Sequence, residues 1–489
     1  MAPENRRAWA ALDLGTSRLK AGVFDGRRFA VVGSVPAPVR YGGAGRARCA
    51  WDGVWRGSEE LLRRVGAWCA EYGATQLDLG LCGQVSSLLA WDPGKGAPVE
   101  NEFPIWADST CRGALEETTA FLSGGRDLDL LGTPLPLSTN WLLVKLRGRG
   151  ARPDGVKYLQ VHDAVFARLT GLYHSHPSGQ ISLVDQRTGE YSAEALDFAG
   201  VDRDALPLLA GGRPQPLKDE WAKAAGLPPA TRVHPGLADM SAAFGGLDLA
   251  GGEGFCLANT SEIMGFFADA PPTPPPARLV TAPVGAGWVS YGSTASGGHT
   301  VGWLLKEVLR CGEGDLPALM AEAEEVAPGC DGLLCLPYLA GERAPLWDPD
   351  LSGAFVGLRA DHGRGHLVRA VLEGVAFGRR QLAEAFGRPM PAAFKLAGGG
   401  SANPLWNGIR AAVLERPLAV CGAEELSLLG ALRLSGARSG QTEWASLLDM
   451  RRLEPDPGWT AVYKDIYPRF LALQRALRDP ERPGPEGRA

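Results

Sequence analysis

The sequence lacks both long uncharged apolar runs and any concentration of basic residues. Its 489 residues contain 50 Lys and Arg against 55 Asp and Glu, which gives a formal net charge of −5. No apolar stretch approaches the roughly 20 residues that span a bilayer, and the polar residues 1–7 lack the apolar core of a signal peptide. Without a basic stripe, binding to nucleic acid is not expected. We therefore expect neither a membrane nor a nucleic acid as partner.

Patterned cysteines and a P-loop are missing as well. The nine cysteines are an odd number, and even the nearest pair, Cys330 and Cys335, does not form a metal or disulfide motif. Reduced thiols of a cytoplasmic protein are the simplest interpretation. The chain also has no glycine-rich segment that ends in Gly-Lys-Ser or Gly-Lys-Thr, so it is not a P-loop kinase.

The length and the hydrophobic content of 45% predict a globular protein with two large domains. Amphipathic spacing predicts helices at residues 58–72, 161–169 and 365–386, and apolar runs predict strands at 77–81 and 394–397. Alternation of strands and helices indicates an α/β architecture. We expect domains at 1–246 and 247–478, a hinge near 245–252, and a disordered Pro- and Gly-rich tail at 479–489.

Two similar hairpin patterns occur half a chain apart. The first joins apolar runs 9–14 and 19–24 through Gly15-Thr-Ser-Arg, and the second joins 255–258 and 263–267 through Asn259-Thr-Ser-Glu. Gly15 can adopt backbone angles that are closed to other residues. The repetition indicates a duplicated domain, although two such hairpins can also arise independently.

The Thr-Ser turns suggest phosphate binding. Consecutive backbone N–H groups in a tight turn can hold phosphate oxygens, and Asp13, just before the first turn, can hold Mg²⁺ through water. The alternative is an ordinary hairpin with an aspartate before its turn. A glycine-rich segment that follows the strand at 394–397 would let a ligand approach the backbone. The predicted nucleotide-binding residues are Gly15, Thr16, Ser17, Lys20, Thr260, Ser261, Gly298, Gly399, Gly400, Ser401 and Asn403.

Together, the ordered motifs from about Trp9 to Gly436 resemble the FGGY carbohydrate kinase family of the actin-like superfamily. In chain order they are residues 11–25, Cys82-Gly-Gln84, Trp106-Ala-Asp108, His162-Asp163, Gly236-Leu-Ala-Asp239, Asn259-Thr-Ser261, Gly341-Glu-Arg-Ala-Pro345, residues 372–377 and residues 396–401. Residues 341–347 resemble xylulokinases and gluconokinases rather than glycerol kinases. The resemblance implies two actin-like (ribonuclease H-like) domains that flank a deep cleft, with ATP and Mg²⁺ as cofactors.

The resemblance also implies a catalytic residue. Asp239 matches the aspartate that accepts the proton of the sugar hydroxyl during attack on the γ-phosphate, and this residue is predicted to contact the sugar as well. Judged by its sequence neighbourhood alone, Asp239 is more simply interpreted as a helix N-cap.

The predicted sugar-binding residues depart from the family pattern. They are Gln84, Val85, Ser86, Trp106 and Asp108, together with Asp239. Xylulose-type members have Met-His-Gly where this chain has Val85-Ser-Ser87, and the usual arginine two residues after the aspartate is replaced by Thr110. Gln84 and Asp108 can each form paired hydrogen bonds with sugar hydroxyls; the alternative for both is a buried turn or cap. Arg343 could approach a phosphate or a carboxylate, or brace the domain interface.

The leading hypothesis is an ATP-dependent, cytoplasmic kinase of a pentulose such as xylulose, acting on a small-molecule sugar. The first alternative is a gluconokinase or polyol kinase of the same family. A non-catalytic sugar sensor and an actin-like or chaperone ATPase are alternatives of other classes. The sequence leaves a homodimer open.

Overall fold

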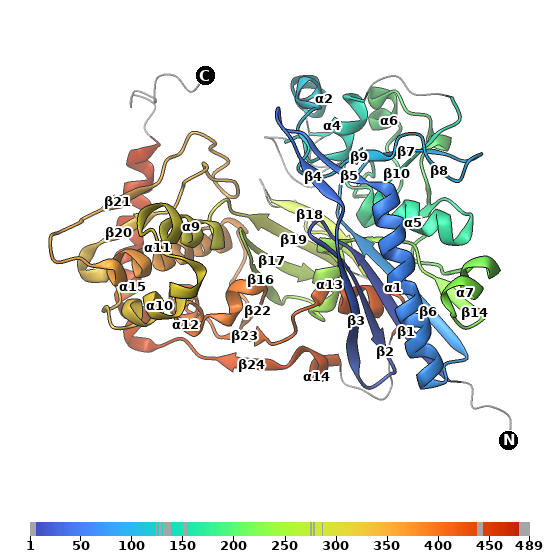
Figure 1. Ribbon diagram of the computed structural model, residues 1–489. Helices are drawn as coiled ribbons and strands as arrows, with labels where there is room; N and C mark the ends of the chain where they lie inside the picture. Colours follow the sequence, from blue (N-terminus) through green and yellow to red (C-terminus); the bar gives the residue numbers. More distant parts are fainter. Residues whose placement is uncertain are drawn as a thin grey trace. The chain divides into compact units, whose positions relative to one another are not determined.

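The computed structural model describes residues 6–123, 125–126, 130, 138–149, 154–273, 276, 279–285, 287–437 and 444–478. They form two compact units (Figure 1). The first unit contains the chain up to Leu249 together with Thr281–Trp288 and Glu425–Leu448, and the second contains the remainder. The units interleave along the chain, so they do not correspond one to one to the continuous domains predicted at 1–246 and 247–478. Those domain limits stay a prediction. The tail at 479–489 lies outside the described residues.

A seven-stranded sheet forms the centre of the first unit. Its order is β13-β14-β6-β1-β2-β3, and β15 also pairs with β6. The strands are β1 (Arg7–Leu14), β2 (Arg18–Phe24), β3 (Phe29–Pro36), β6 (Gln76–Gly83), β13 (Gln215–Pro216), β14 (Ala230–Val233) and β15 (Leu237–Ala238). The predicted first hairpin is β1 and β2. Strands β1 and β15 both run parallel to β6, which brings the carboxyl ends of all three to one edge.

Side chains along β1 alternate between two cores. Ala8, Ala10, Leu12 and Leu14 pack in the core that includes helix α1 (Trp51–Tyr72), which lies along β1 to β3 (Figure 1). Ala11 belongs to the core on the opposite face. Because successive side chains point to opposite faces of a strand, this alternation puts Asp13 on the same face as Ala11.

Helix α1 begins at Trp51, seven residues before the predicted start at residue 58. Ser58 is the kind of residue that often caps a helix, but its hydroxyl is buried and donates to the carbonyl of Val54, one turn earlier. The helix ends at Gly73, whose φ of 75° is in the left-handed region.

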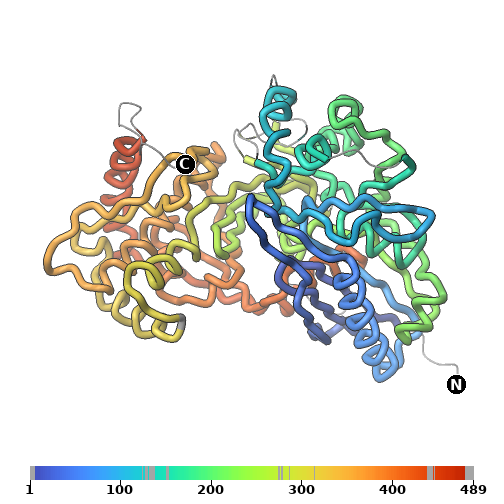
Figure 2. The backbone as a smooth tube through the Cα atoms, turned by 45° about the horizontal axis from the view of Figure 1, so that its top comes forward, coloured from blue at the N-terminus to red at the C-terminus, as the bar shows by residue number. Residues whose placement is uncertain are grey.

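The opposite face of the sheet is covered by α8 (Asp239–Gly246) and α13 (Leu426–Leu434). The two helices approach closely because glycines face backbone: a Cβ at Gly430 would lie 1.6 Å from the carbonyl oxygen of Ala242, and one at Gly246 would lie 2.3 Å from that of Leu426. Figure 2 shows the chain after residue 424 returning to the strands of the first unit. Helix α13 is therefore part of the first unit although it follows most of the second.

The rest of the first unit consists of short sheets and helices. One small sheet has the order β4-β5-β9, a second β10-β7-β8, and a third pairs β11 with β12. These strands are β4 (Val39–Tyr41), β5 (Ala47–Ala50), β7 (Leu89–Asp92), β8 (Ala97–Pro98), β9 (Glu102–Pro104), β10 (Lys157–Leu159), β11 (His174–Ser175) and β12 (Leu208–Leu209). The helices are α2 (Leu115–Leu122), α4 (Leu142–Arg147), α5 (Val161–Thr170), α6 (Ala193–Ala199), α7 (Asp219–Ala225) and α14 (Trp444–Leu448).

Another seven-stranded sheet, in the order β18-β19-β17-β16-β22-β23-β24, contains the long strands of the second unit, although most of β18 and the start of β19 fall in the segment Thr281–Trp288 that is grouped with the first unit. Its strands are β16 (Gly254–Ala258), β17 (Glu262–Ala268), β18 (Val280–Val284), β19 (Gly287–Ser293), β22 (Phe394–Ala397), β23 (Leu418–Cys421) and β24 (Met450–Leu453). The helices are α9 (Gly298–Trp303), α10 (Leu316–Glu324), α11 (Arg364–Ala385), α12 (Pro404–Leu414) and α15 (Pro457–Leu477), and β20 (Leu334–Leu336) pairs with β21 (Ala354–Val356).

The central arrangement of the first unit recurs in the second. Strand β16 is antiparallel to β17 and parallel to β22, as β1 is antiparallel to β2 and parallel to β6. The predicted hairpins and the α/β class are confirmed. No helix in the described part of the chain is long and apolar enough to cross a membrane.

Candidate active site

Asp13 and Asp239 come together at the edge where β1, β6 and β15 end. Burial raises the pKa of Asp13 to about 7, and the charge of Asp239 adds to this effect. Burial also raises the pKa of Asp239 to about 6, although the amide of Met240 donates to its Oδ1 at 2.7 Å and opposes the rise. Among the described residues, Asp13 Oδ1 is buried without a hydrogen-bond partner. Asp13 therefore has a carboxyl oxygen without a partner in the described residues, close to a second acid, Asp239.

An ion pair lies beside the two aspartates. The ammonium of Lys20 contacts the carboxylate of Glu425 at 2.6 Å, so this predicted nucleotide ligand is held by a residue that leads into α13. Lys20 lowers the pKa of Asp13, whereas Glu425 raises it. Within the described ranges, no group of three or more His, Cys, Asp or Glu side chains is arranged to hold a metal ion. One or two carboxylates nevertheless suit Mg²⁺, which keeps several waters and binds substrate phosphates.

The first Thr-Ser turn requires glycine at position 15, but not because of the unusual backbone angles that the sequence predicted. Gly15 is not among the residues with positive φ, so the expectation of unusual backbone angles there is wrong. A Cβ at Gly15 would instead lie 2.9 Å from the carbonyl oxygen of Arg18, which requires glycine sterically. Thr16 accepts a hydrogen bond from the indole Nε1 of Trp106 at 3.0 Å, and Ser17 is exposed. The turn is thus linked to the predicted sugar-binding loop.

Gln84 follows β6 directly and lies next to the end of β1. Its backbone N–H donates to the carbonyl of Leu14 at 3.2 Å, and within the described residues its buried side-chain Oε1 has no hydrogen-bond partner. Val85 is half-buried. Ser86 has a φ of 55°, and its amide donates to Gln160 Oε1 at 2.7 Å. Gln160 thus holds the turn, and the side chain of Gln84 keeps an acceptor for a polar ligand.

Asp108 uses its carboxylate to organise its own loop. It accepts hydrogen bonds from the amide of Ala47 at 2.9 Å and from the amide and hydroxyl of Thr110, and Arg48 Nε lies 3.1 Å from Oδ2. Burial raises the pKa of this carboxyl, but these hydrogen bonds and Arg48 outweigh it, so the pKa lies below its ordinary value. Thr110 stands where the family usually has an arginine, and the cation that pairs with Asp108 is Arg48 on β5, which no motif marks.

Another buried acid, Asp163, lies next to His162, which packs against the segment just before β15 and Asp239. From the sequence, the two residues were identified only as a family motif. His162 and Asp163 begin α5, and a Cβ at Gly236 would lie 2.6 Å from the Cβ of His162. Burial lowers the pKa of His162 to about 3 and raises that of Asp163 to about 7, so at neutral pH the imidazole is uncharged and the carboxyl is partly protonated. The role of the pair here is to pack against the segment before β15.

The predicted nucleotide ligands of the second unit gather around one turn. The amide of Gly298 donates to the carbonyl of Asn259 at 3.0 Å, and a Cβ at Gly398 would lie 2.5 Å from Asn259 Oδ1. Thr260 is exposed and Ser261 half-buried. A Cβ at Gly400 would lie 3.2 Å from the carbonyl oxygen of Ala258. The glycine-rich segment and the Thr-Ser turn therefore lie side by side.

The remaining predicted residues of this segment shape it. Gly399 is exposed, and a Cβ there would meet nothing within 4 Å. Ser401 Oγ donates to the carbonyl of Gly398 at 2.7 Å, and Asn403 caps α12 by accepting from the amide of Trp406 at 2.9 Å. Arg343 Nη2 donates to the carbonyl of Thr294 at 2.5 Å, so this guanidinium contacts the backbone of its own unit.

Sequence reasoning missed a buried ionic cluster behind this turn. Glu262, the residue after Ser261, pairs with both Arg379 and Arg410, and all three side chains are buried. Arg410 Nη2 lies 2.7 Å from the carboxylate, while its Nη1 donates to the carbonyl of Gly400 at 2.9 Å. Burial lowers the pKa of both arginines. The cluster ties the Thr-Ser turn to the glycine-rich segment, and only the unexpected arginines in apolar helices could have signalled it.

The duplicated hairpin-and-parallel-strand arrangement, with acidic residues at the strand edge of the first unit, is that of actin-like, two-domain proteins. Residues 8–246 match the N-terminal domain, and residues 254–438 the C-terminal domain, of the FGGY family of carbohydrate kinases. The chain belongs to this family. It is therefore a phosphotransferase with sugar kinase activity.

Individual relatives and solved structures agree with this assignment. A gluconokinase of Bacillus licheniformis is 29% identical over 413 residues, which cover 78% of this chain and 80% of the relative. A xylulose kinase of Lactococcus lactis subsp. lactis is 27% identical over 434 residues, with 84% of each covered. The crystal structure of a xylulose kinase from Rhodospirillum rubrum matches with a TM-score of 0.84 and 25% identity, over 96% of this chain and 99% of that one.

Proposed function

We propose that the enzyme transfers the γ-phosphoryl group of ATP to a hydroxyl of a small sugar, with Asp239 as general base. The supporting observation is the carboxylate pair at the sheet edge: burial raises the pKa of Asp239 to about 6. A base of this strength is ionised at neutral pH yet binds a proton more tightly than an ordinary aspartate. General-base efficiency is greatest when the pKa lies near the working pH.

In the proposed step, Asp239 accepts the proton of the sugar hydroxyl as that oxygen attacks the γ-phosphorus. The O–H bond breaks and an O–P bond forms, while the bond from the γ-phosphorus to the bridging oxygen breaks and ADP departs with the electron pair. Most of the acceleration in phosphoryl transfer comes from positioning and electrostatic stabilisation. The turns at Gly15–Ser17 and Thr260–Ser261 would donate backbone N–H and hydroxyl groups to phosphate oxygens.

Asp13 would hold Mg²⁺ through water. Its Oδ1, buried without a partner among the described residues, and the nearby charge of Asp239 suit a cation. The bound metal would neutralise charge on the phosphates of ATP. Asp13 itself would keep the metal's water shell oriented at the end of β1.

The substrate we favour is a pentulose such as xylulose, with gluconate as the second candidate. Gln84, with its unpartnered buried oxygen, and Trp106, linked to Thr16, would contact sugar hydroxyls. Val85 and Ser86 would line the same wall, and Asp108 would act through its loop. Gluconate is supported by the gluconokinase relative at 29% identity and by the residues at 85–87, which depart from xylulose-type members.

A coupled assay of ADP release across D-xylulose, gluconate and glycerol tests the substrate. We expect the highest kcat/KM with xylulose. Higher kcat/KM with gluconate would replace the first candidate by the second. Asp239→Asn serves as the control, because it removes the proposed base and leaves the Thr-Ser turns intact. If Asp239→Asn retained the full rate on the preferred sugar, the proposed role of Asp239 would be wrong.

A further inference from the structure

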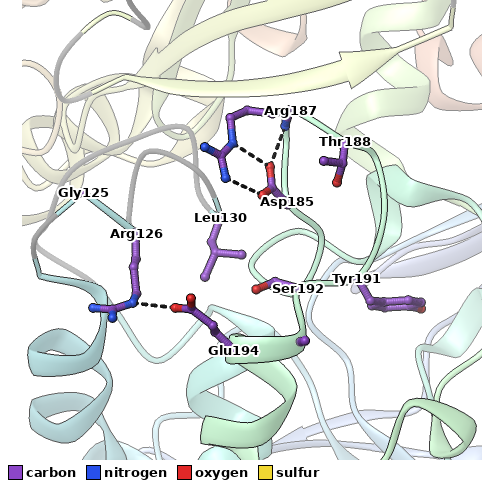
Figure 3. A pocket seen from close by; sticks show the side chains of 10 residues that line it. Gly125, Arg126, Leu130, Asp185, Arg187, Thr188, Tyr191, Ser192 and Glu194 are labelled. Carbon is purple, nitrogen blue, oxygen red and sulfur yellow. Dashed lines mark hydrogen bonds and ion pairs between the residues drawn. The ribbon is translucent and has the colours of Figure 1, made fainter.

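Two cavities of the first unit differ in how their charges are balanced. The larger, of about 600 Å³, is lined by two arginines that are already neutralised: Arg126 pairs with Glu194 at 2.8 Å, and Arg187 with Asp185 at 2.7 Å (Figure 3). These charges cancel within the protein, so the cavity shows no preference for a charged ligand. The smaller cavity, of about 130 Å³, is not balanced in this way.

The smaller cavity lies between the loop that follows β9 and helix α4. Its charged lining residues are Arg48, Lys145 and Arg149 against a single carboxylate, Asp108. Three cations against one anion leave two positive charges in excess. Arg149 is occupied with the protein itself, because it donates to the Tyr158 hydroxyl at 2.7 Å and to backbone carbonyls. The donors that remain for a ligand therefore belong to Lys145 and to Arg48, although Arg48 is also paired with Asp108.

Lys145 is the least satisfied of these groups. It is 3% exposed, and its ammonium donates to one acceptor, the backbone carbonyl of Asp108, at 2.8 Å. In the described part of the chain no carboxylate lies within 4.0 Å of its Nζ. Burial of an ammonium is costly unless the charge is paired, and burial lowers the pKa of Lys145 accordingly. An anion in the cavity would supply the missing partner.

Arg48 and Thr110 complete the lining at the other side. Arg48 Nε lies 3.1 Å from Asp108 Oδ2, and its Nη2 donates to Thr110 Oγ1 at 3.2 Å. Only the Nη2 contact is a hydrogen bond, because Nε has no hydrogen-bond partner among the described residues, and the guanidinium carries five N–H groups in all. The guanidinium therefore keeps donors for a further acceptor while it is held in place by Asp108.

We propose that this cavity binds a small oxyanion, a carboxylate or phosphate group, with the Lys145 ammonium and the Arg48 guanidinium as its charged ligands. Its volume suits one such group rather than a nucleotide. The cavity shares only Asp108 with the predicted sugar-binding residues and none with the pair Asp13 and Asp239. The anion is either free in solution or the acid group of a sugar acid. The proposal does not depend on the identity of the phosphorylated sugar.

Binding is tested by titrating the full-length protein, without ATP, with inorganic phosphate, acetate or gluconate at constant ionic strength. Isothermal titration calorimetry gives Kd, and the thermal midpoint should rise with ligand concentration. We expect saturable binding of at least one of the three anions and at least a tenfold weaker Kd in Lys145→Met. Lys95→Met is the matched control, because Lys95 is exposed and does not line the cavity; its Kd should equal that of the wild type.

Two further variants keep the result decisive if Lys145→Met does not fold. Lys145→Arg retains the charge and should retain binding, and Arg48→Gln should weaken it. Absence of binding of all three anions by the wild type, or equal Kd values in the wild type and the charge-removing variants, would overturn the proposal.

Kinetics separates the two sources of the anion. A higher KM for gluconate but not for xylulose in Lys145→Met assigns the site to the acid group of the sugar. Unchanged KM values together with Lys145-dependent phosphate binding assign it to a free anion. Because binding is measured without turnover, an enzyme inactive on every sugar tested would refute the proposed function and leave this result intact.

Discussion

Replacement of Asp239 by Asn separates a catalytic from a purely structural role, because the two roles predict opposite effects on stability. As a general base, Asp239 contributes about 10²- to 10⁴-fold to the rate, which corresponds to about 3–5 kcal/mol of activation free energy. We therefore expect kcat to fall by that factor in Asp239→Asn. The affinity for a non-hydrolysable ATP analogue should change little, because the Thr-Ser turns are untouched.

The stability change follows from the raised pKa of Asp239. Its ordinary value of 3.8 rises to about 6 in the folded protein, and at 1.36 kcal/mol per pKa unit this difference is worth about 3 kcal/mol. The folded state binds the proton more tightly than the unfolded state, so stability falls as pH rises from about 4 to about 6 and stays lower above that range. Asparagine cannot ionise, so Asp239→Asn should be more stable than the wild type at pH 7.5, by up to about 3 kcal/mol.

Urea denaturation at pH 7.5, and again at lower pH, measures this difference. The advantage of Asp239→Asn should shrink as the pH falls below 6 and should vanish well below 4, where the wild-type carboxyl is protonated in both states. A carboxylate that only stabilises the first turn of α8 is worth about 0.3–1 kcal/mol, and its loss would lower stability instead. A less stable Asp239→Asn that keeps the wild-type kcat would therefore refute the catalytic assignment.

Three further predictions concern the pH dependence of catalysis, the ionic cluster around Glu262 and the contact between α8 and α13. The kcat/KM should rise with pH through about 6 as Asp239 ionises, and a flat profile from pH 5 to 8 would contradict its role as base. Glu262→Gln removes the carboxylate shared by two buried arginines and should cost about 3–5 kcal/mol in urea denaturation; Glu384→Gln, at a more exposed ion pair, should cost less than about 1 kcal/mol. Gly430→Ala places a Cβ 1.6 Å from a carbonyl of α8, so it should destabilise by about 1–3 kcal/mol and lower kcat. Gly378→Ala, where a Cβ meets nothing within 4 Å, should leave both unchanged or raise stability slightly.

Structural features that depend on residues close together in the chain could be predicted from the sequence. The two hairpins, the strand at 394–397 and the helix after Val161 each have a local apolar pattern with turn residues at the ends, and the structure contains all of them. The start of α1 was predicted seven residues late, at Ser58, whose hydroxyl in fact bonds one turn back within a helix that begins at Trp51. The requirement for Gly15 was attributed to backbone angles, whereas the nearby carbonyl of Arg18 is the cause.

Features that depend on distant residues could not be predicted from the sequence. Lys20 was assigned to nucleotide binding, but its partner Glu425 lies 405 positions along the chain, and no periodicity relates the two. Arg48, Lys145 and the arginines that pair with Glu262 belong to no motif, because burial in the tertiary structure, and not sequence spacing, gives them their roles. Asp239 was identified through family resemblance, since its local sequence by itself favours a helix N-cap.

The close packing of α13 against α8 sets the order in which the protein becomes complete during its synthesis. Asp239 and Ser427, whose hydroxyl donates to the carbonyl of Asp239, are 188 residues apart. At about 5–20 residues per second, translation of that interval takes on the order of 10–40 s. Throughout that time the apolar core on this face of the first sheet, which includes Phe24 on β2 and Ala242 on α8, lacks its contacts with α13. Apolar surface that is exposed transiently in this way is prone to aggregation, so the nascent chain is most vulnerable until α13 has been made.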